Sequence, residues 1–368
     1  MPPLALHNGD RYHQPPVFKE RRMIEDIMNS RWGGYIVMAV LMGAIALLLR
    51  VLYGPRGLFR DPKWDEENQR IRSEEKLKRQ WKEERFQLDM HYPPARDISP
   101  APGHRLSLEE HCSLFRHYAA SFITAKEEDA PLRLKEVHSL RVFDHAKRIV
   151  QSEHFSENIA RAGLLAALYH DCGRFPQYRQ YRTFADALSV NHARLSLDTL
   201  KKEHFLIGEE KEVRSLVQTA VLLHNKSSLP AKLLPEARLV TDMVRDADKL
   251  DIISIMVSHF SQALPENDAV FLHVKDSPEL CSPEVVQCVL AGRVVSYREL
   301  HYVNDFRLLL GTWMHELHFA ATWKELQKRG DMEKVLSNLP DTPELRSAVL
   351  YLKNLMYSQG KKYSSETV

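Results

Sequence analysis

The sequence predicts an all-α protein, and three observations support this fold class. Apolar residues within 157–169 cover most of a helix circumference, which indicates a buried helix, and Ser156 is placed to cap its start. Asp341-Thr342-Pro343 has the composition of a late helix start. A further apolar series follows helical spacing through Val213, Leu216, Val217, Ala220 and Leu223.

The first predicted element is a single membrane-spanning helix over residues 33–53, preceded by an N-terminal extension of residues 1–32. Residues 33–49 carry no charge, which places them at the lower edge of the length that crosses a bilayer. Residues 51–53 extend the segment if Arg50 snorkels. The long extension argues against a cleaved signal peptide, and a buried soluble helix is the alternative interpretation.

The next elements are a charged stalk and a linker. Residues 61–90 alternate Lys, Arg and Glu around sparse apolar residues, which favours a solvated helical stalk over a coiled coil. Residues 91–105 are rich in proline and are predicted to be a linker. A large helical domain is expected over residues 106–358, followed by a disordered tail of residues 359–368.

Six side chains within this domain have the chemistry of metal ligands. Neutral imidazoles mixed with carboxylates suit first-row transition metals better than calcium, which prefers an all-oxygen shell. Any one histidine alone is weak evidence, but an ordered set is not. The set is His138, His170, Asp171, His192, His224 and Asp248.

The order of these residues resembles the HD superfamily of metal-dependent phosphohydrolases. The resemblance covers about residues 130–265, the motif core, and includes the apolar run before the doublet, Gly-Arg-Phe after it and the string Arg245–Asp251. It implies an HD-type helical bundle. His138 matches the first ligand, and His170 and Asp171 match the doublet that names the family.

The resemblance also implies how the ligands divide between ions. Asp171 would bridge two ions, and it and His170 are the catalytic residues by this resemblance. His138, His170 and Asp248 would hold one ion, and His192 and His224 the other. Manganese, iron, cobalt, nickel and zinc stay open. If the two extra histidines are not ligands, a single-metal phosphomonoesterase is the better description.

Two local ambiguities accompany this set. On a helix Asp248 and Asp251 share a face, so Asp251 is either a neighbour of the ligands or a surface charge. Asp246 cannot join them and is expected to be a solvated carboxylate. The ligands are expected where helix ends converge, with His138 opening its helix and Gly173 stopping the helix that carries the doublet.

Basic residues near the ligands are predicted to bind a phosphorylated substrate. Residues 174–184 interleave arginines with aromatics around a proline in a turn-like stretch, and an exposed basic loop is the alternative. The predicted substrate contacts are Arg174, Arg179, Arg182, Lys226 and Lys249.

Other motifs do not carry chemistry. His315-Glu316-Leu317-His318 has its histidines three apart rather than the four of a zinc-protease signature, and it is interpreted as polar decoration of a helix. Cys172 is expected to be a packed thiol and His145 at most a neighbour of the ligands. The four cysteines lack zinc or redox spacing and are interpreted as free thiols.

The charge balance of the chain and its expected compartment limit the classes of function that fit. With 51 basic and 49 acidic residues there is no broad basic field, which disfavours a nucleic-acid partner. Lys and Arg balance on both sides of residues 33–53, so charge does not orient the helix, but a phosphorylated substrate favours a cytosolic domain. We expect a single-pass membrane phosphohydrolase for a nucleotide or similar small phosphate ester. The alternative is an inactive nucleotide- or metal-sensing module, and either could form a homo-oligomer.

Overall fold

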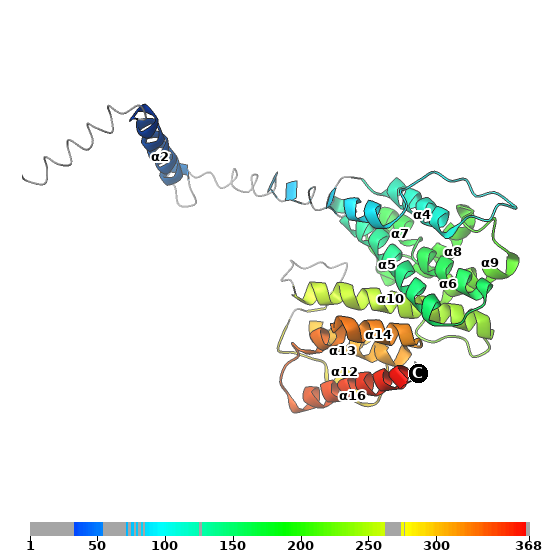
Figure 1. Ribbon diagram of the computed structural model, residues 1–368. Helices are drawn as coiled ribbons and strands as arrows, with labels where there is room; N and C mark the ends of the chain where they lie inside the picture. Colours follow the sequence, from blue (N-terminus) through cyan, green and yellow to red (C-terminus); the bar gives the residue numbers. More distant parts are fainter. Residues whose placement is uncertain are drawn as a thin grey trace, which may run out of the picture. The chain divides into compact units, whose positions relative to one another are not determined.

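The computed structural model describes residues 33–53, 71–72, 75–76, 79, 82–83, 85–124, 127–261, 274–275 and 277–365 (Figure 1). Regular structure within these ranges is helical, apart from an isolated bridge between Lys275 and Tyr302. The predicted all-α fold is therefore confirmed. The predicted N-terminal extension lies outside the described residues.

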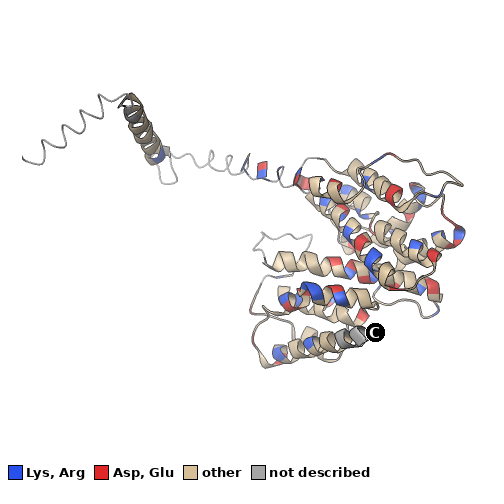
Figure 2. Ribbon diagram, viewed as in Figure 1, with Lys and Arg blue, Asp and Glu red and all other residues tan. Residues whose placement is uncertain are grey.

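The chain divides into two compact units, Met1–Arg79 and Gln80–Val368. The first contains helix α2 (Gly33–Tyr53), which has the bounds predicted for the membrane-spanning helix. Arg50 is its one charged residue (Figure 2). Among the described residues, however, no helix combines the length and the apolar character that a membrane span requires. The structure therefore does not support the predicted transmembrane anchor.

The end of the stalk is fixed in the second unit. Each described residue between 71 and 91 is helical, and the other residues of the predicted stalk lie outside the described part of the chain. Arg116 donates to Asp89 at 2.6 Å, and Arg85 lies 3.6 Å from Glu136. These ion pairs involve buried partners, so the last turns of the stalk are not purely solvated.

The proline-rich segment predicted as a linker has no helix from residue 92 to residue 105. It is nevertheless held in place by hydrogen bonds. Arg116 donates to the carbonyl of Pro93 at 2.7 Å, and the backbone N–H of Arg96 donates to the carbonyl of Ser113 at 3.3 Å. The segment packs on the helical domain and is not a free spacer.

The described α-helices of the helical domain range from 6 residues in α15 (Asp331–Leu336) to 27 residues in α10 (Pro235–Ser261). Basic and acidic residues are interspersed along them (Figure 2). In chain order the elements are α4 (Leu108–Phe122), η1 (Glu127–Asp129), α5 (Ala130–Ser152), α6 (Glu157–Tyr169), α7 (Arg174–Tyr181), η2 (Asp186–Leu188), α8 (His192–Lys202), α9 (Lys211–Leu223), α10 (Pro235–Ser261), α12 (Pro283–Leu290), η3 (Tyr297–Glu299), α13 (Val303–Thr312), η4 (Trp313–Glu316), α14 (Ala320–Arg329), α15 (Asp331–Leu336) and α16 (Pro343–Ser365).

Two hydrophobic cores meet along α10. The first core packs α4, α5, α6 and α9 against the first half of α10, up to Ala247. The second begins at Leu250 and packs the rest of α10 against α12 to α16. In Figure 1, α10 accordingly lies between the α5–α6 layer and the α13–α14 layer. Residues 162–169 of α6 are all buried, which confirms the helix expected to be covered on most sides.

The C-terminal helix is longer than predicted. The tail of residues 359–368 was expected to be disordered, but α16 continues to Ser365, and only residues 366–368 lie outside the described part of the chain. Leu345, Ala348 and Leu352 anchor the helix in the second core. Once such a helix is nucleated, adding further turns costs little, which explains its length.

Candidate metal centre

Six side chains from separate elements converge between the two cores, and all of them are buried except Asp248, whose side chain is 18 % exposed. Three of them, His170, His192 and His224, lie at helix ends. Asp248 lies in the middle of α10, and His138 does not open its helix, because α5 begins eight residues earlier at Ala130, with Pro131 in its first turn. The set is His138 in α5, His170 at the end of α6, Asp171 in the turn that follows, His192 at the start of α8, His224 at the end of α9 and Asp248 in α10.

The turn after α6 depends on Gly173, although not as predicted. Gly173 has a φ of −70°, so it is not the left-handed helix stop expected from the sequence. A Cβ there would lie 2.3 Å from the backbone nitrogen of Ser196, and the Gly173 N–H donates to the Ser196 hydroxyl at 2.9 Å. The missing side chain lets α8 pack directly on the turn, and α8 carries His192.

The first cluster consists of His138, His170 and Asp248. The Nε2 atom of His138 lies 3.1 Å from Asp248 Oδ1 and 3.3 Å from His170 Nε2, and His170 Nε2 lies 3.7 Å from the same Asp248 oxygen. Burial and Lys135 oppose protonation of His138, but the neighbouring carboxylates of Asp248 and Asp251 outweigh them and raise its pKa. Two imidazole nitrogens and one carboxylate oxygen thus point at a common centre.

The second cluster consists of His192 and His224, whose Nε2 atoms are 3.1 Å apart. Asp171 lies between the two clusters. Its Oδ2 is 3.7 Å from Nε2 of both His138 and His170, and its Oδ1 is 3.7 Å from His192 Nε2 and 3.8 Å from His224 Nε2. Each oxygen of this one carboxylate therefore faces a different pair of histidines.

The other ring nitrogen of each histidine is held by an acceptor. His138 Nδ1 donates to Asp251 at 2.7 Å, and His192 Nδ1 donates to Asp186 at 2.7 Å. His170 and His224 each donate Nδ1 to the carbonyl three residues earlier, at 2.8 and 2.7 Å, where the helix end leaves that carbonyl free. Carboxylates and carbonyls can only accept, so each Nδ1 carries the proton and each Nε2 presents a lone pair to the centre.

For His192, His224 and Asp171 the electrostatic balance favours the forms that bind metal ions. Burial and then the neighbouring histidines lower the pKa of His224 to about 3, and burial and then Arg174 lower the pKa of His192. Burial opposes ionisation of Asp171, but Lys135 chiefly outweighs it and holds the pKa of that carboxyl well below its usual range. Neutral imidazole and ionised carboxylate are the forms that bind metal ions.

Two buried carboxylate oxygens, one in each part of the centre, also fit bound metal ions. Asp171 Oδ1 and Asp248 Oδ1 are inaccessible to solvent and accept no hydrogen bond from the described residues. Buried carboxylate oxygens normally have partners, so an orphan in each cluster needs an explanation. A divalent cation held by nitrogen and oxygen donors satisfies both, and the residues present therefore fit a metal centre.

The family comparison agrees with this geometry. The family model of the HD domain matches residues 136–253, a range that contains all six converging side chains. The comparison thus finds an HD domain at residues 136–253, which supports membership of the HD superfamily. HD domains are typically metal-dependent phosphohydrolases, which matches a nitrogen and carboxylate set of this kind. No curated protein and no solved structure matches the chain.

The acidic residues of α10 in the HD domain have three different roles. Asp251, left open between two interpretations, is buried and holds the His138 ring while Arg141 Nε donates to it at 2.6 Å. Asp246 is not the solvated carboxylate expected. It is buried and accepts from the backbone N–H of His318 at 2.9 Å and the hydroxyl of Thr322 at 2.9 Å. Asp246 caps the start of α14, which is close to it in space but distant in the sequence.

The segment from His315 to His318 leads from η4 towards α14 and is held against α10 by ion pairs. It is not on an α-helix, since η4 ends at Glu316 and α14 starts at Ala320. Glu316 pairs with Arg245 at 3.1 Å and with Lys249 at 3.0 Å, both on α10. The predicted polar decoration of a helix is therefore wrong.

Two cations of the HD domain and its edge lie against Asp171. Lys135 Nζ is 2.7 Å from Asp171 Oδ2, and Arg174 Nε is 3.4 Å from Oδ1. Both also lie over the ring of Phe184, each 5.6 Å from its centroid. Arg174 begins α7, so the predicted turn-like stretch is mostly helical. The helix tolerates Pro176 because this residue lies in the first turn, where a backbone N–H would have no helical partner.

The other predicted substrate contacts lie in different surroundings. Arg179 pairs with Asp129 at 3.0 Å and also donates to the carbonyl of Phe122, so its guanidinium is engaged in packing. Lys249 is buried against Glu316. Arg182 and Lys226 are exposed. Of the five predicted basic contacts, the structure brings Arg174 to the ligand set.

Lys135 and Asp186 were not predicted from the sequence to belong to the site. Lys135 lies one helical turn before His138, a signal that could have been used if the helix had been extended to Ala130. Asp186 reaches His192 through irregular backbone around η2, where no periodicity predicts which side chains meet.

The remaining side chains near the doublet are packed in the interior. Cys172 is fully buried, burial raises the pKa of its thiol, and it donates to the carbonyl of Ser196. All four cysteines are free thiols, which confirms that interpretation. His145 is buried seven residues after His138 and bonds Arg148.

Proposed function

We propose that the HD domain is a metal-dependent phosphohydrolase that acts on a nucleotide or a similar small phosphate ester. The observation that carries this proposal is the Asp171 carboxylate, whose two oxygens face two separate histidine pairs. One bridging carboxylate between two nitrogen-rich clusters suits a pair of ions that act together on one phosphoryl group.

The chain's own residues prepare the site for that chemistry. Bound divalent ions would lower the pKa of a water molecule and offset negative charge on the phosphoryl oxygens. The acceptors on each Nδ1 fix the imidazole rings, which reduces reorganisation when the site is filled. Lys135 and Arg174 place two further positive charges beside Asp171, where a phosphoryl group would develop negative charge.

The substrate class is supported by the same corner of the site. Phe184 offers an aromatic surface next to the ammonium of Lys135 and the guanidinium of Arg174. A flat base and an anionic phosphate on one small molecule match this pairing of an aromatic ring with cations. The mono- or diester character of the substrate is left to experiment.

The test uses purified full-length protein that is stripped with chelator and reloaded with manganese or iron. Phosphate release is then measured from nucleotides and from phosphodiesters. Asp171→Asn should abolish release, whereas Asp198→Asn, an exposed carboxylate on α8, should behave as wild type.

Two results would contradict hydrolysis. Tight nucleotide binding without phosphate release would favour the alternative sensing module. Equal release by Asp171→Asn and wild type would place the activity elsewhere. Membrane attachment, cytosolic orientation and self-association stay predictions.

A further inference from the structure

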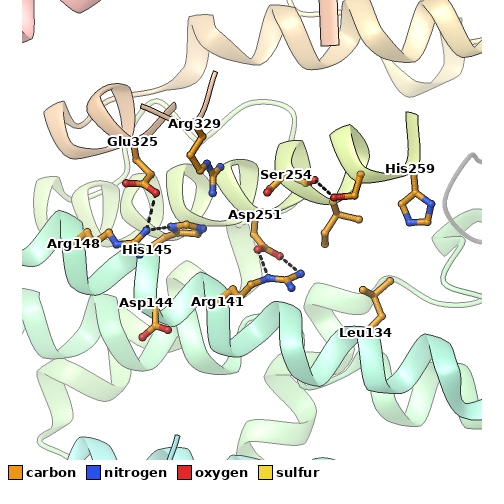
Figure 3. Close-up of a pocket in the computed structure, with 12 residues that line it drawn as sticks. Leu134, Arg141, Asp144, His145, Arg148, Asp251, Ser254, His259, Glu325 and Arg329 are labelled. Atoms are coloured by element: carbon orange, nitrogen blue, oxygen red, sulfur yellow. Dashed lines mark hydrogen bonds and ion pairs between the residues drawn. The ribbon is translucent and has the colours of Figure 1, made fainter. Parts of the chain in front are cut away.

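A cavity of about 420 Å³ lies between α5, α10 and α14, beside the metal centre rather than in it. Its charged lining consists of three arginines, Arg141, Arg148 and Arg329, together with Asp144, Asp251 and Glu325. Figure 3 shows Arg148, His145, Glu325 and Arg329 at one end of the cavity, and Leu134 and His259 at the other.

One side chain separates this cavity from the metal centre. Asp251 lines the cavity, and its Oδ2 accepts from His138 Nδ1 at 2.7 Å. The same carboxylate accepts from Arg141, from Nε at 2.6 Å and from Nη2 at 3.2 Å. A change in the position of Arg141 would therefore alter the group that orients a metal ligand.

The arginine end has more donors than acceptors. Arg148 directs Nη1 to Glu325 at 3.1 Å and to His145 Nδ1 at 3.3 Å, and Arg329 donates Nη2 to a backbone carbonyl at 2.7 Å. Within the described residues, Arg141 Nη1, Arg148 Nε and Nη2, and Arg329 Nη1 have no hydrogen-bond partner. Arg329 Nε is buried and donates no hydrogen bond, although Asp331 lies 2.9 Å away.

Each arginine has one acidic partner in the described part of the chain, Asp251 for Arg141, Glu325 for Arg148 and Asp331 for Arg329, so each guanidinium keeps N–H groups that no carboxylate there accepts from. Asp144 already pairs with Lys147 at 3.2 Å and accepts from Tyr92, and Asp251 is shared with His138. Burial and then Arg329, Arg148 and Arg141 lower the pKa of His145 to about 3 although Asp251 opposes them, so this ring is neutral among the arginines.

We propose that this cavity is a regulatory site for a small phosphorylated molecule, bound through Arg148, Arg329 and Arg141 and coupled to the metal centre through Asp251. Guanidinium groups bind phosphate oxygens with paired, charge-assisted hydrogen bonds. Leu134 and Ile255 provide an apolar end for the organic part of the ligand. The volume is in the range of small-molecule sites.

A bound ligand would act on the metal centre through Arg141. A bound phosphate would compete with Asp251 for Arg141 and leave Asp251 more fully to His138. The ligand would then change the affinity of the first cluster for its ion, and the ion would change the affinity for the ligand by the same factor.

Binding is tested with adenosine 5′-monophosphate as the probe, by calorimetry on full-length protein after chelation. Arg148→Ala should weaken binding at least tenfold, because it removes a charged partner. The matched control is Arg194→Ala, an exposed arginine of α8 that also pairs with a carboxylate. Absence of saturable binding, or equal binding by wild type and Arg148→Ala, would overturn the site.

Coupling is tested by titrating manganese with and without the probe. We expect the probe to shift manganese affinity at least threefold in wild type and in Arg194→Ala, and not in Arg148→Ala, whose manganese affinity without the probe stays normal. A probe that binds without shifting manganese affinity would overturn the regulatory role. Since no turnover is needed, a failure of the proposed hydrolysis leaves both results interpretable.

Discussion

Substituting Gly173 with alanine should loosen the attachment of α8 and with it one half of the metal centre. The new Cβ would lie 2.3 Å from Ser196 N, 2.7 Å from Leu195 C and 2.9 Å from His192 O, all backbone atoms. Contacts of this kind relax only near 3.4 Å, so the start of α8 must move by about 1 Å. Backbone cannot rotate away as the tip of a side chain can.

The expected cost is about 1–3 kcal/mol, the range for forcing extra atoms into a packed interior. A shift of about 1 Å at His192 also exceeds the roughly 0.2 Å tolerance of metal–ligand distances, so the second cluster should bind its ion at least tenfold more weakly. The first cluster, built on α5, α6 and α10, should change much less.

Urea unfolding and manganese titration measure the two effects. Gly163→Ala is the matched control in the same core, since its Cβ would meet only the flexible end of Met243, at 2.2 Å from the sulfur. Alanine also favours a helix interior by about 1 kcal/mol over glycine. If Gly173→Ala unfolds at the wild-type urea concentration and binds manganese like wild type, the close packing of α8 on the turn does not position His192.

Two further substitutions test buried carboxylates. Glu209 accepts hydrogen bonds from Arg161 and His111. Burial raises the pKa of this carboxyl, but the two hydrogen bonds, above all the one from Arg161, outweigh burial and lower the pKa to about 2. The contribution of Glu209 to folding stability is therefore complete above about pH 4.5 and is lost as the pH falls through about 2. Glu209→Gln should therefore cost about 2–3 kcal/mol at pH 7 and flatten the loss of stability between these pH values, as measured by denaturation across pH. Asp246→Asn should cost about 1–3 kcal/mol in urea unfolding because a buried set of donors loses a charged acceptor and one of its two oxygens, while exposed Asp198→Asn should cost less than about 0.5 kcal/mol. Equal stability of Asp246→Asn and wild type would show that the cap of α14 is unimportant.

The sequence was most informative where periodicity and order carry the signal. The apolar run of residues 157–169 predicted a helix buried on most sides, and α6 is such a helix. The order of histidines and aspartates predicted which six side chains converge, and the structure brings them together without testing their roles in solution. Helix ends also accounted for His170 and His224, whose Nδ1 atoms use carbonyls that only a helix end leaves free.

Contacts between distant segments could not be predicted in this way. Asp246 meets His318 across 72 positions, so nothing local distinguishes it from a solvated carboxylate. Arg179 has the composition of a phosphate contact, but its ion pair with Asp129 depends on how α7 packs beside η1. The glycine at position 173 was interpreted as a conformational requirement, whereas the neighbouring helix makes it a requirement of space.

The most direct test of the metal centre is the metal content of purified full-length protein, measured by mass spectrometry after reloading with manganese. We expect about two ions per chain in wild type, as a bridging carboxylate between two clusters requires. His224→Ala should retain about one ion, because the cluster of His138, His170 and Asp248 stays intact. A wild-type chain that binds no ion, or a His224→Ala variant with the same content as wild type, would contradict the two-cluster centre.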